Sequence, residues 1–275
     1  MQYRSPVQAT DFLSRYDAFL LDIDGVLVRG SRSLEGAARG LRRLQDRGRT
    51  ILLTNNSSRS RAQVAEELAA RGFSVAADDV VSSAYVVSRH LSREHGAVSV
   101  WVVGEEGLKI ELLLAGHRMS KRPEGAEWVV AGIDRNVNYK TLTEALRALS
   151  SGARLVGTNG DPAFPASEGL LPGAGSILGA LEGMGFKPEA VVGKPSPIAF
   201  RAALELLDGD STSVLMIGDR LETDIVGGTD AGLDTALVLT GITNRAMLDA
   251  SGIRPTWVSE SLDTLAAGKL ESTTG

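Results

Sequence analysis

The sequence contains no cysteine and only three histidines, and aromatic residues make up 5% of it. Without cysteine the chain has no disulfide framework, thiolate zinc site, iron–sulfur cluster or thiol nucleophile. His90, His95 and His117 lie in helical or loop stretches away from any motif, so a histidine-rich metal site or a serine triad is poorly supplied. The chemistry of this protein must therefore rest on carboxylates, lysine and hydroxyl groups.

A basic surplus is also absent, because 29 lysines and arginines against 34 aspartates and glutamates give a net charge of −5. This balance argues against a nucleic acid polymer as partner. No apolar run reaches membrane-spanning length, and the N-terminal stretch has scattered acidic residues, so we expect no membrane partner and a cytoplasmic location. The length of 275 residues allows one large α/β domain, or one domain that carries a second as an insert.

Short apolar runs rich in β-branched residues alternate with amphipathic stretches that close on glycine, which predicts an α/β fold with a parallel sheet. The pattern restarts a third of the way along the chain. We therefore predict a discontinuous core, residues 1–84 and 187–275, and an inserted α/β domain at residues 85–186. The stretch 158–176, rich in proline and glycine, is predicted to be a structured loop, and residues 268–275 a frayed tail.

The first candidate site follows the apolar run at residues 18–23. Side chains two residues apart in an extended chain point the same way, so Asp22 and Asp24 are expected to leave the strand together. Two adjacent carboxylates suit Mg²⁺ and proton transfer, and Gly25 allows close approach of the backbone to a ligand. On this motif alone, a surface turn in which the aspartates cap backbone N–H groups explains the residues equally well.

A second polar loop follows the next apolar run and contains Thr54, Asn55 and Asn56. It precedes an expected helix, whose free N–H groups and dipole favour an anion such as a phosphate oxygen. An ordinary capped helix start explains the same residues, and taken alone it is the better explanation.

The third loop follows the run at residues 214–217 and carries two more acidic residues, Asp219 and Asp224, for which helix capping is again the plain alternative. Lys194 ends another short apolar run and precedes Pro-Ser-Pro, so we expect its ammonium at the same sheet edge as the acidic residues. Open parallel sheets bind ligands at the carboxyl ends of their strands. A lysine among these acids would neutralise a bound phosphate.

These loops resemble, in the same order, the four motifs of the haloacid dehalogenase-like (HAD) hydrolases of the NagD and p-nitrophenyl phosphatase type. The similar segments are LLDIDGVL, LLTNNSS, VVGKPSP and IGDRLETDI, and residues 129–149 and 155–176 are similar to the cap of that subfamily. The resemblance runs nearly end to end. It implies a Rossmann-like, three-layer α/β core with an inserted α/β cap of the C2 type.

The resemblance also implies catalytic roles. Asp22 would attack phosphorus and form an aspartyl-phosphate, and Asp24 would act as general acid and then base. Mg²⁺ would be held by Asp22, the backbone carbonyl of Asp24, and Asp219, with Asp224 supporting them.

The resemblance implies phosphate binding by residues of the second polar loop and by Lys194. Thr54 and Asn55, with Asn56 beside them, would bind the transferring phosphoryl group, and Lys194 would neutralise its charge. The cap loop would contact the leaving group, where Asn159 serves either binding or structure. Phe164 replaces the histidine of relatives that act on pyridoxal phosphate, so it is either a substrate contact or a loop anchor.

The function implied is Mg²⁺-dependent hydrolysis of a small phosphorylated metabolite, a sugar, glycerol, glycolate or nucleotide phosphate. Two alternatives remain: a phosphotransferase or phosphomutase, and a non-hydrolytic phosphate-binding module. The second has no need of a general acid at Asp24, which an ester hydrolase requires to expel an alkoxide. The subfamily also implies a possible homodimer through the cap.

Overall fold

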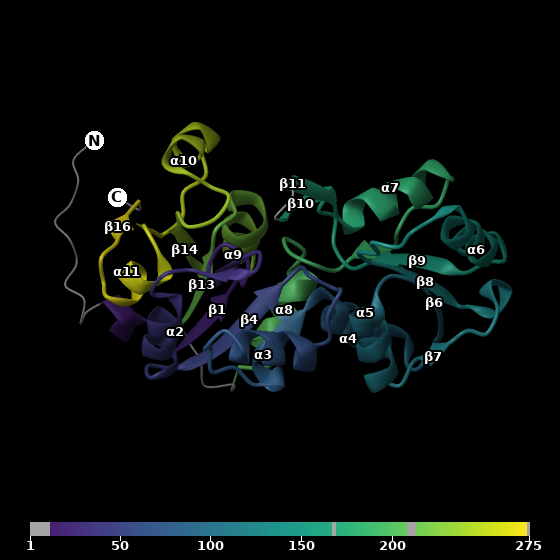
Figure 1. The fold of residues 1–275 in the computed structure, drawn as a ribbon, viewed down its shortest axis with the longest axis horizontal. Helices are drawn as coiled ribbons and strands as arrows, with labels where there is room; N and C mark the ends of the chain where they lie inside the picture. The colour runs from purple at the N-terminus through teal and green to yellow at the C-terminus, as the bar shows by residue number, and fades with distance from the viewer. Residues whose placement is uncertain (1–11, 167–168, 208–212, 274–275) are drawn as a thin grey trace. The chain divides into compact units, whose positions relative to one another are not determined.

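The computed structural model describes residues 12–166, 169–207 and 213–273 (Figure 1). The chain divides into two compact units. Unit 1 comprises Met1–Thr54, Glu66–Val80 and Phe200–Gly275, and unit 2 comprises Asn55–Ala65 and Val81–Ala199. The predicted insert at residues 85–186 falls within unit 2, which also includes residues 55–65, 81–84 and 187–199. Whether unit 2 acts as a cap stays a prediction.

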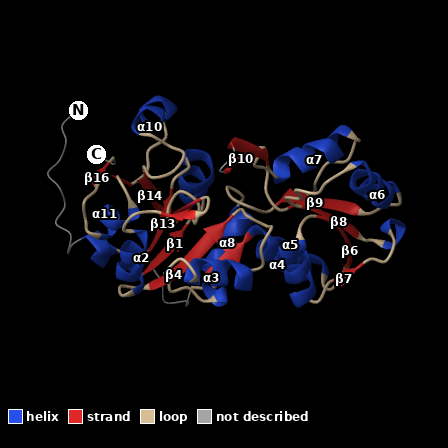
Figure 2. Ribbon diagram, viewed as in Figure 1, coloured by secondary structure: helices blue, strands red, loops and turns tan. Residues whose placement is uncertain are grey.

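Unit 1 is built around a seven-stranded sheet in the order β16-β15-β14-β13-β1-β4-β5 (Figure 2). Its inner strands are mostly buried apolar runs, as parallel strands covered on both faces require: β1 is buried throughout, and β13 and β14 are buried after their first residue. The strands are β1 (Ala18–Leu21), β4 (Arg49–Thr54), β5 (Val80–Ser82), β13 (Val214–Gly218), β14 (Asp234–Val238), β15 (Trp257–Ser259) and β16 (Glu271–Ser272), with a separate hairpin of β2 (Val28–Arg29) and β3 (Arg32–Ser33).

The helices associated with this sheet are short. They are α2 (Ala37–Gln45), α3 (Arg61–Ala69), α8 (Pro197–Leu204), α9 (Gly227–Asp230), α10 (Arg245–Ser251) and α11 (Leu262–Ala266), with 3-10 turns η1 (Leu13–Arg15) and η2 (Ala77–Asp79). A π-helical turn, η4 (Leu221–Val226), directly precedes α9. Strand β5 and helices α3 and α8 each begin in one unit and end in the other.

Unit 2 contains a five-stranded parallel sheet in the order β12-β9-β8-β6-β7. Its strands are β6 (Ser99–Val103), β7 (Arg118–Met119), β8 (Trp128–Ala131), β9 (Arg154–Gly157) and β12 (Ala190–Val191). The helices are α4 (Ser83–His95), α5 (Glu106–Leu114), α6 (Tyr139–Ser150) and α7 (Ala174–Gly183), with the 3-10 turn η3 (Pro123–Gly125).

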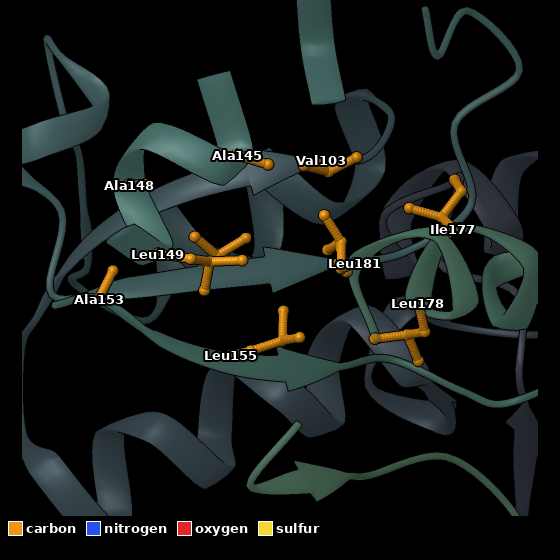
Figure 3. Close-up of a cluster of buried hydrophobic side chains, with 11 residues drawn as sticks. Val103, Ala145, Ala148, Leu149, Ala153, Leu155, Ile177, Leu178 and Leu181 are labelled. Atoms are coloured by element: carbon orange, nitrogen blue, oxygen red, sulfur yellow. The ribbon is translucent and has the colours of Figure 1, made fainter. Parts of the chain in front are cut away.

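The core of unit 2 lies where α6 and α7 pack on the sheet. Figure 3 shows Leu155 of β9 with Leu149 of α6 and Leu178 and Leu181 of α7 in one cluster, each at most 4% exposed. Trp128 and Trp257 are buried in their units, and Trp101, which also lies in an apolar run, is half-buried. Within the described ranges, no helix combines the length and hydropathy needed to cross a membrane.

Two expectations about irregular segments were wrong. The stretch expected to be one structured loop contains a hairpin, β10 (Ala163–Ala166) and β11 (Gly169–Pro172), followed by α7. Both strands of a two-stranded hairpin are edges, where proline is tolerated, so the prolines did not prevent it. The expected frayed tail contributes β16, which pairs antiparallel with β15 through Trp257 and Val258. Backbone hydrogen bonds to β15 hold β16 in the sheet, and the polar sequence of this segment gives no indication of them.

Tyr16 forms a buried polar link in unit 1. Its hydroxyl donates to Asp234 Oδ2 at 2.7 Å and accepts from Trp257 Nε1 at 2.6 Å, and its ring packs edge-on against Phe12. Burial raises the pKa of Tyr16 well above its ordinary value of 10.0. A tyrosine whose pKa is raised on folding stabilises the protein fully below pH 10, and this stability is lost as the pH rises beyond that value.

We expect Tyr16→Phe to lower the free energy of unfolding by about 1–3 kcal/mol near neutral pH, because Trp257 Nε1–H loses its buried acceptor. Urea unfolding measures this change, and Tyr139→Phe is the control because that side chain is 88% exposed. The variant should also lose less stability than the wild type above pH 10, since one titrating group is gone. An alkaline loss equal to that of the wild type would contradict the argument.

Candidate functional site

Two acidic residues leave adjacent strands of unit 1 at the same edge. β1 and β13 run parallel with Leu21 opposite Ile217, and the backbone N–H of Asp22 donates to Ile217 O at 2.9 Å. Asp22 is the residue after β1 and Asp219 the residue after β13. The expectation that carboxylates gather at the carboxyl ends of parallel strands is confirmed for this pair.

Asp22, Asp219 and Asp224 form a buried cluster in which each offers a carboxylate oxygen within 4.8 Å of the others. Asp224 is fully buried, and its Oδ2 accepts from the backbone N–H groups of Asp219 and Arg220, each at 3.1 Å. Asp219 Oδ2 accepts from the backbone N–H of Ile242 at 2.6 Å. Backbone donors thus hold both side chains in one orientation.

Glycines leave room for Asp219. A Cβ at Gly25 would lie 2.4 Å from Asp219 Oδ2, and one at Gly241 would lie 1.8 Å from the same atom. Gly25 also has φ +82°, a conformation that favours glycine. Thr240 reinforces the arrangement, because its hydroxyl donates to Gly25 O at 2.6 Å.

The cluster suits a hard divalent cation. Three mutually close carboxylates repel one another unless a cation or a proton lies between them, and carboxylate oxygens are the ligands that Mg²⁺ prefers. Among the residues that the structure describes, this is the group of acidic and histidine side chains with metal-ligand spacing. The donor set therefore fits Mg²⁺, and the division into direct ligands, Asp22 and Asp219, and a support, Asp224, stays a prediction.

Asp24 and Thr54 also belong to unit 1. Asp24 is exposed and forms a single β-bridge with Val28, so its side chain can exchange protons with solvent. It is not a member of the three-carboxylate group, and a contribution through its backbone carbonyl stays a prediction. Thr54 is the last residue of β4 and 4% exposed.

Asn55 and Lys194 belong to unit 2. Lys194 is 4% exposed and follows β12, which pairs with β9 in the five-stranded sheet and not with the sheet that holds Asp22. The strand before Lys194 therefore does not belong to the sheet that was expected, and the place of the Lys194 ammonium beside the acidic residues stays a prediction. The apolar run before it is short, and the free edge of β9 pairs with its two strand residues.

Asn55 and Asn159 are linked by hydrogen bonds. Asn55 Nδ2 donates to Asp161 Oδ2 and to Lys194 O, each at 3.0 Å, and Asn159 Nδ2 donates to Asn55 O at 2.7 Å. Asn56 Oδ1 accepts from the backbone N–H and the hydroxyl of Ser58, which is a local turn. For these asparagines the structure shows structural contacts, and a role in binding stays a prediction.

Phe164 lies half-buried in β10 opposite Leu171, and its role also stays a prediction. Sequence reasoning missed Asp161 and the loop of Thr240 and Ile242. Asp161 lies inside the stretch 158–176, which is rich in proline and glycine, so this composition could have directed attention to it. Nothing local marks residues 240–243, whose importance comes from their contacts with Gly25 and Asp219.

A polar cavity of about 680 Å³ opens in unit 2 beside the start of α5 and of α6. Glu105 and Arg135 form a two-pronged ion pair in its wall, with N···O distances of 2.7 and 2.6 Å. Arg135 lowers the pKa of Glu105 by hydrogen bonding to the charged carboxylate. None of the residues singled out from the sequence lines this cavity.

Comparisons with known proteins concern the chain as a whole. A family model described as haloacid dehalogenase-like hydrolase matches residues 19–118, and a HAD-hydrolase-like model matches residues 191–265. The chain is 36% identical to the 5'-nucleotidase YutF of Bacillus subtilis, with 91% of this chain and 97% of that protein covered.

Solved structures give the same result. A p-nitrophenyl phosphatase from Archaeoglobus fulgidus is 37% identical, with a TM-score of 0.85 and coverage of 91% of this chain and 98% of that one. A glycerol phosphate phosphatase from Mycobacterium tuberculosis, solved with magnesium, is 36% identical, with a TM-score of 0.85 and coverage of 92% and 77%.

Proposed function

Because this chain belongs to the haloacid dehalogenase-like hydrolases, of the NagD and p-nitrophenyl phosphatase type, we propose that it hydrolyses a small phosphate monoester through an aspartyl-phosphate on Asp22. The chain is an enzyme, a phosphoric monoester hydrolase with Mg²⁺ as cofactor. The observation that carries the proposal is the buried group of Asp22, Asp219 and Asp224 at adjacent strand ends.

In this proposal Asp22 is the nucleophile and Asp24 transfers the protons. An Asp22 carboxylate oxygen forms a bond to phosphorus as the bond to the leaving alkoxide breaks, and Asp24 gives its proton to that alkoxide. Asp24 then takes a proton from water as the water oxygen attacks phosphorus, which releases orthophosphate and restores Asp22. The exposure of Asp24 supports this role, because a group that accepts and donates a proton in turn needs access to water.

Asp22 and Asp219 would hold Mg²⁺, with the Asp24 carbonyl as a further ligand. When bound, the ion supplies positive charge that offsets the negative charge of the phosphoryl group and of Asp22. Asp224 keeps Asp219 in place through the backbone N–H groups that it accepts. Positioning and charge stabilisation are most of phosphoryl-transfer catalysis.

Phosphate binding is assigned to Thr54, Asn55 and Lys194 by motif order. The side-chain amide of Asn55 donates to Asp161 Oδ2 and to Lys194 O. We therefore assign the phosphate contacts to the Thr54 hydroxyl and to the backbone N–H of Asn55. The Lys194 ammonium would neutralise the charge of the transferring group.

The substrate class is a small phosphorylated metabolite. The relatives named above act on nucleotides, p-nitrophenyl phosphate and glycerol phosphate, so we place the substrate of this chain among nucleotide, sugar, glycerol and glycolate phosphates. A cap role for residues 85–186, with Asn159 and Phe164 near the leaving group, belongs to the same proposal. So do a cytoplasmic location and a homodimer formed through the cap.

Phosphate release from a panel of these esters tests the proposal, with Mg²⁺ and with EDTA. We expect release with Mg²⁺ and a loss of at least about 100-fold when EDTA is present, recovered by added Mg²⁺. The ranking of kcat/KM across the panel identifies the substrate class. Transfer of phosphate to an added alcohol without release would favour a phosphotransferase or phosphomutase. A labelled Asp22 that does not turn over would favour a phosphate-binding module.

A further inference from the structure

Three loops of unit 2 meet beside Lys194. They are residues 55–58, residues 158–161 after β9, and residues 192–196 after β12. The pairing of β12 with β9 continues past both strands, because Val192 N donates to Gly157 O at 3.0 Å and Gly193 N to Thr158 O at 2.8 Å. The loop that leads to the β10–β11 hairpin is thus attached to the segment that carries Lys194.

The junction is tightly packed at Gly193. A Cβ at this position would lie 2.6 Å from Thr158 O, 2.7 Å from Asn55 Oδ1 and 2.8 Å from Asn159 Cβ. Both of the other loops therefore place atoms against this one position of the 192–196 loop. A shift of one loop by an ångström requires the other two to move, since close-packed interiors transmit strain.

Asn55 connects all three loops through hydrogen bonds. Both N–H groups of its side-chain amide are used, one by Asp161 Oδ2 and one by Lys194 O. Its backbone carbonyl accepts from Asn159 Nδ2 at 2.7 Å and from Ser83 Oγ at 2.6 Å. The side chain of Asn55 therefore connects its own loop, residues 55–58, to the backbone of Lys194 by a hydrogen bond.

Asp161 determines the orientation of the Asn55 side-chain amide. An ionised carboxylate only accepts hydrogen bonds, so the Asn55 amide must turn its NH₂ group, and not its oxygen, toward Asp161. The same orientation gives Lys194 O its donor, whereas the reversed amide would place two oxygens against each other. Asp161 is itself held, because its backbone N–H donates to Asn159 Oδ1 at 3.1 Å.

We propose that Asp161 is a positioning residue for phosphoryl transfer. Through Asn55 it fixes the backbone of Lys194, and it thereby joins the loop 158–161 to the two loops assigned to phosphate binding, residues 55–58 and 192–196. The expected effect on catalysis rests on the proposed function. The contacts among the three loops do not depend on it. Without the Asp161 carboxylate, the Asn55 amide rotates, and Lys194 O and the backbone of Asn55 lose their fixed positions. Phosphate binding then weakens at both loops.

The kinetic test compares Asp161→Ala, Asp161→Asn and the wild type with p-nitrophenyl phosphate. We expect Asp161→Ala to lower kcat/KM by about 10- to 100-fold, the usual effect of removing a group that orients a ligand, and to weaken inhibition by orthophosphate in proportion. The half-saturating Mg²⁺ concentration should stay at the wild-type value, because the acidic cluster lies in unit 1. Asp161→Asn should recover most of the loss, since its amide oxygen still accepts from Asn55.

The matched control is Glu127→Ala, an exposed carboxylate of the same unit that accepts a backbone N–H from Ser99. It should leave kcat/KM, orthophosphate inhibition and Mg²⁺ dependence unchanged. An Asp161→Ala enzyme with wild-type kcat/KM and wild-type orthophosphate inhibition would overturn the proposal. A loss of thermal stability alone, with these constants unchanged, would also overturn it.

Hydrogen exchange separates this inference from the proposed function. In Asp161→Ala the amides of residues 55–58 and 192–196 should exchange faster than in the wild type, and those of α6 should not change. Unchanged exchange at both loops would overturn the proposal. A wild-type protein that releases no phosphate from any ester would refute the proposed function, and the exchange result would still decide whether Asp161 holds the junction.

Discussion

Asp22→Asn is expected to lower kcat for phosphate release by at least about 10³-fold, because a carboxamide does not attack phosphorus as a carboxylate does. The substitution also removes one negative charge from the group formed with Asp219 and Asp224, so Mg²⁺ binding should weaken. The measurement is steady-state release of orthophosphate at saturating Mg²⁺, with Mg²⁺ binding followed separately by calorimetry.

The control for this loss is Asp46→Asn, which makes the same change of charge at an exposed position of unit 1 outside the cluster. It should retain the wild-type kcat. Acid-stable labelling distinguishes the routes, since the wild type should carry a transient phosphoryl group that Asp22→Asn cannot form. If Asp22→Asn kept more than about a tenth of the wild-type kcat, Asp22 would not be the nucleophile.

Gly25→Ala should also impair the site, although glycine takes no part in the reaction. The added methyl group would lie 2.4 Å from Asp219 Oδ2 and 2.5 Å from its Cγ, and Asp219 is 2% exposed and bonded to Ile242. The carboxylate must move or the loop must shift. We expect Mg²⁺ affinity to fall by about 10- to 100-fold, with a matching loss of activity at limiting Mg²⁺.

Gly30→Ala is the matched control because it introduces the same backbone strain without the collision. Gly30 has φ +57°, and a Cβ there would meet nothing within 4 Å. Both variants should lose about 1–2 kcal/mol of stability, since each forces alanine into the left-handed region. Only Gly25→Ala should lose Mg²⁺ affinity, so equal Mg²⁺ affinity in the two variants would refute the steric argument.

The candidate site could be read from the sequence where chemistry follows directly on a buried run. Asp22 and Asp219 each come after four or more apolar residues of β1 and β13, so their place at strand ends was predictable. Asp224 was predictable as a support, because an acidic residue early in the helical segment after Asp219 commonly bonds backbone N–H groups. In the structure it accepts from Asp219 and Arg220.

Other elements escaped prediction for identifiable reasons. The β10–β11 hairpin contains prolines that indicate a loop, and it forms because neither strand needs to donate to a further neighbour. β12 has only two residues, too few to show which sheet it joins, so the sheet membership of the strand before Lys194 was assigned wrongly. The contacts of Ile242 and Thr240 follow from no local pattern.

The sequence by itself determined the class of fold, the order of the motifs and the residue types that can perform the chemistry, because these depend on local spacing. Only the tertiary structure decided that Asp22 and Asp219 are neighbours, since β1 and β13 pair across most of the length of the chain. It also decided that Asn55 holds Lys194 and Asp161. Such contacts arise from long-range strand pairing and close packing, which are the sum of many weak interactions that no short segment encodes.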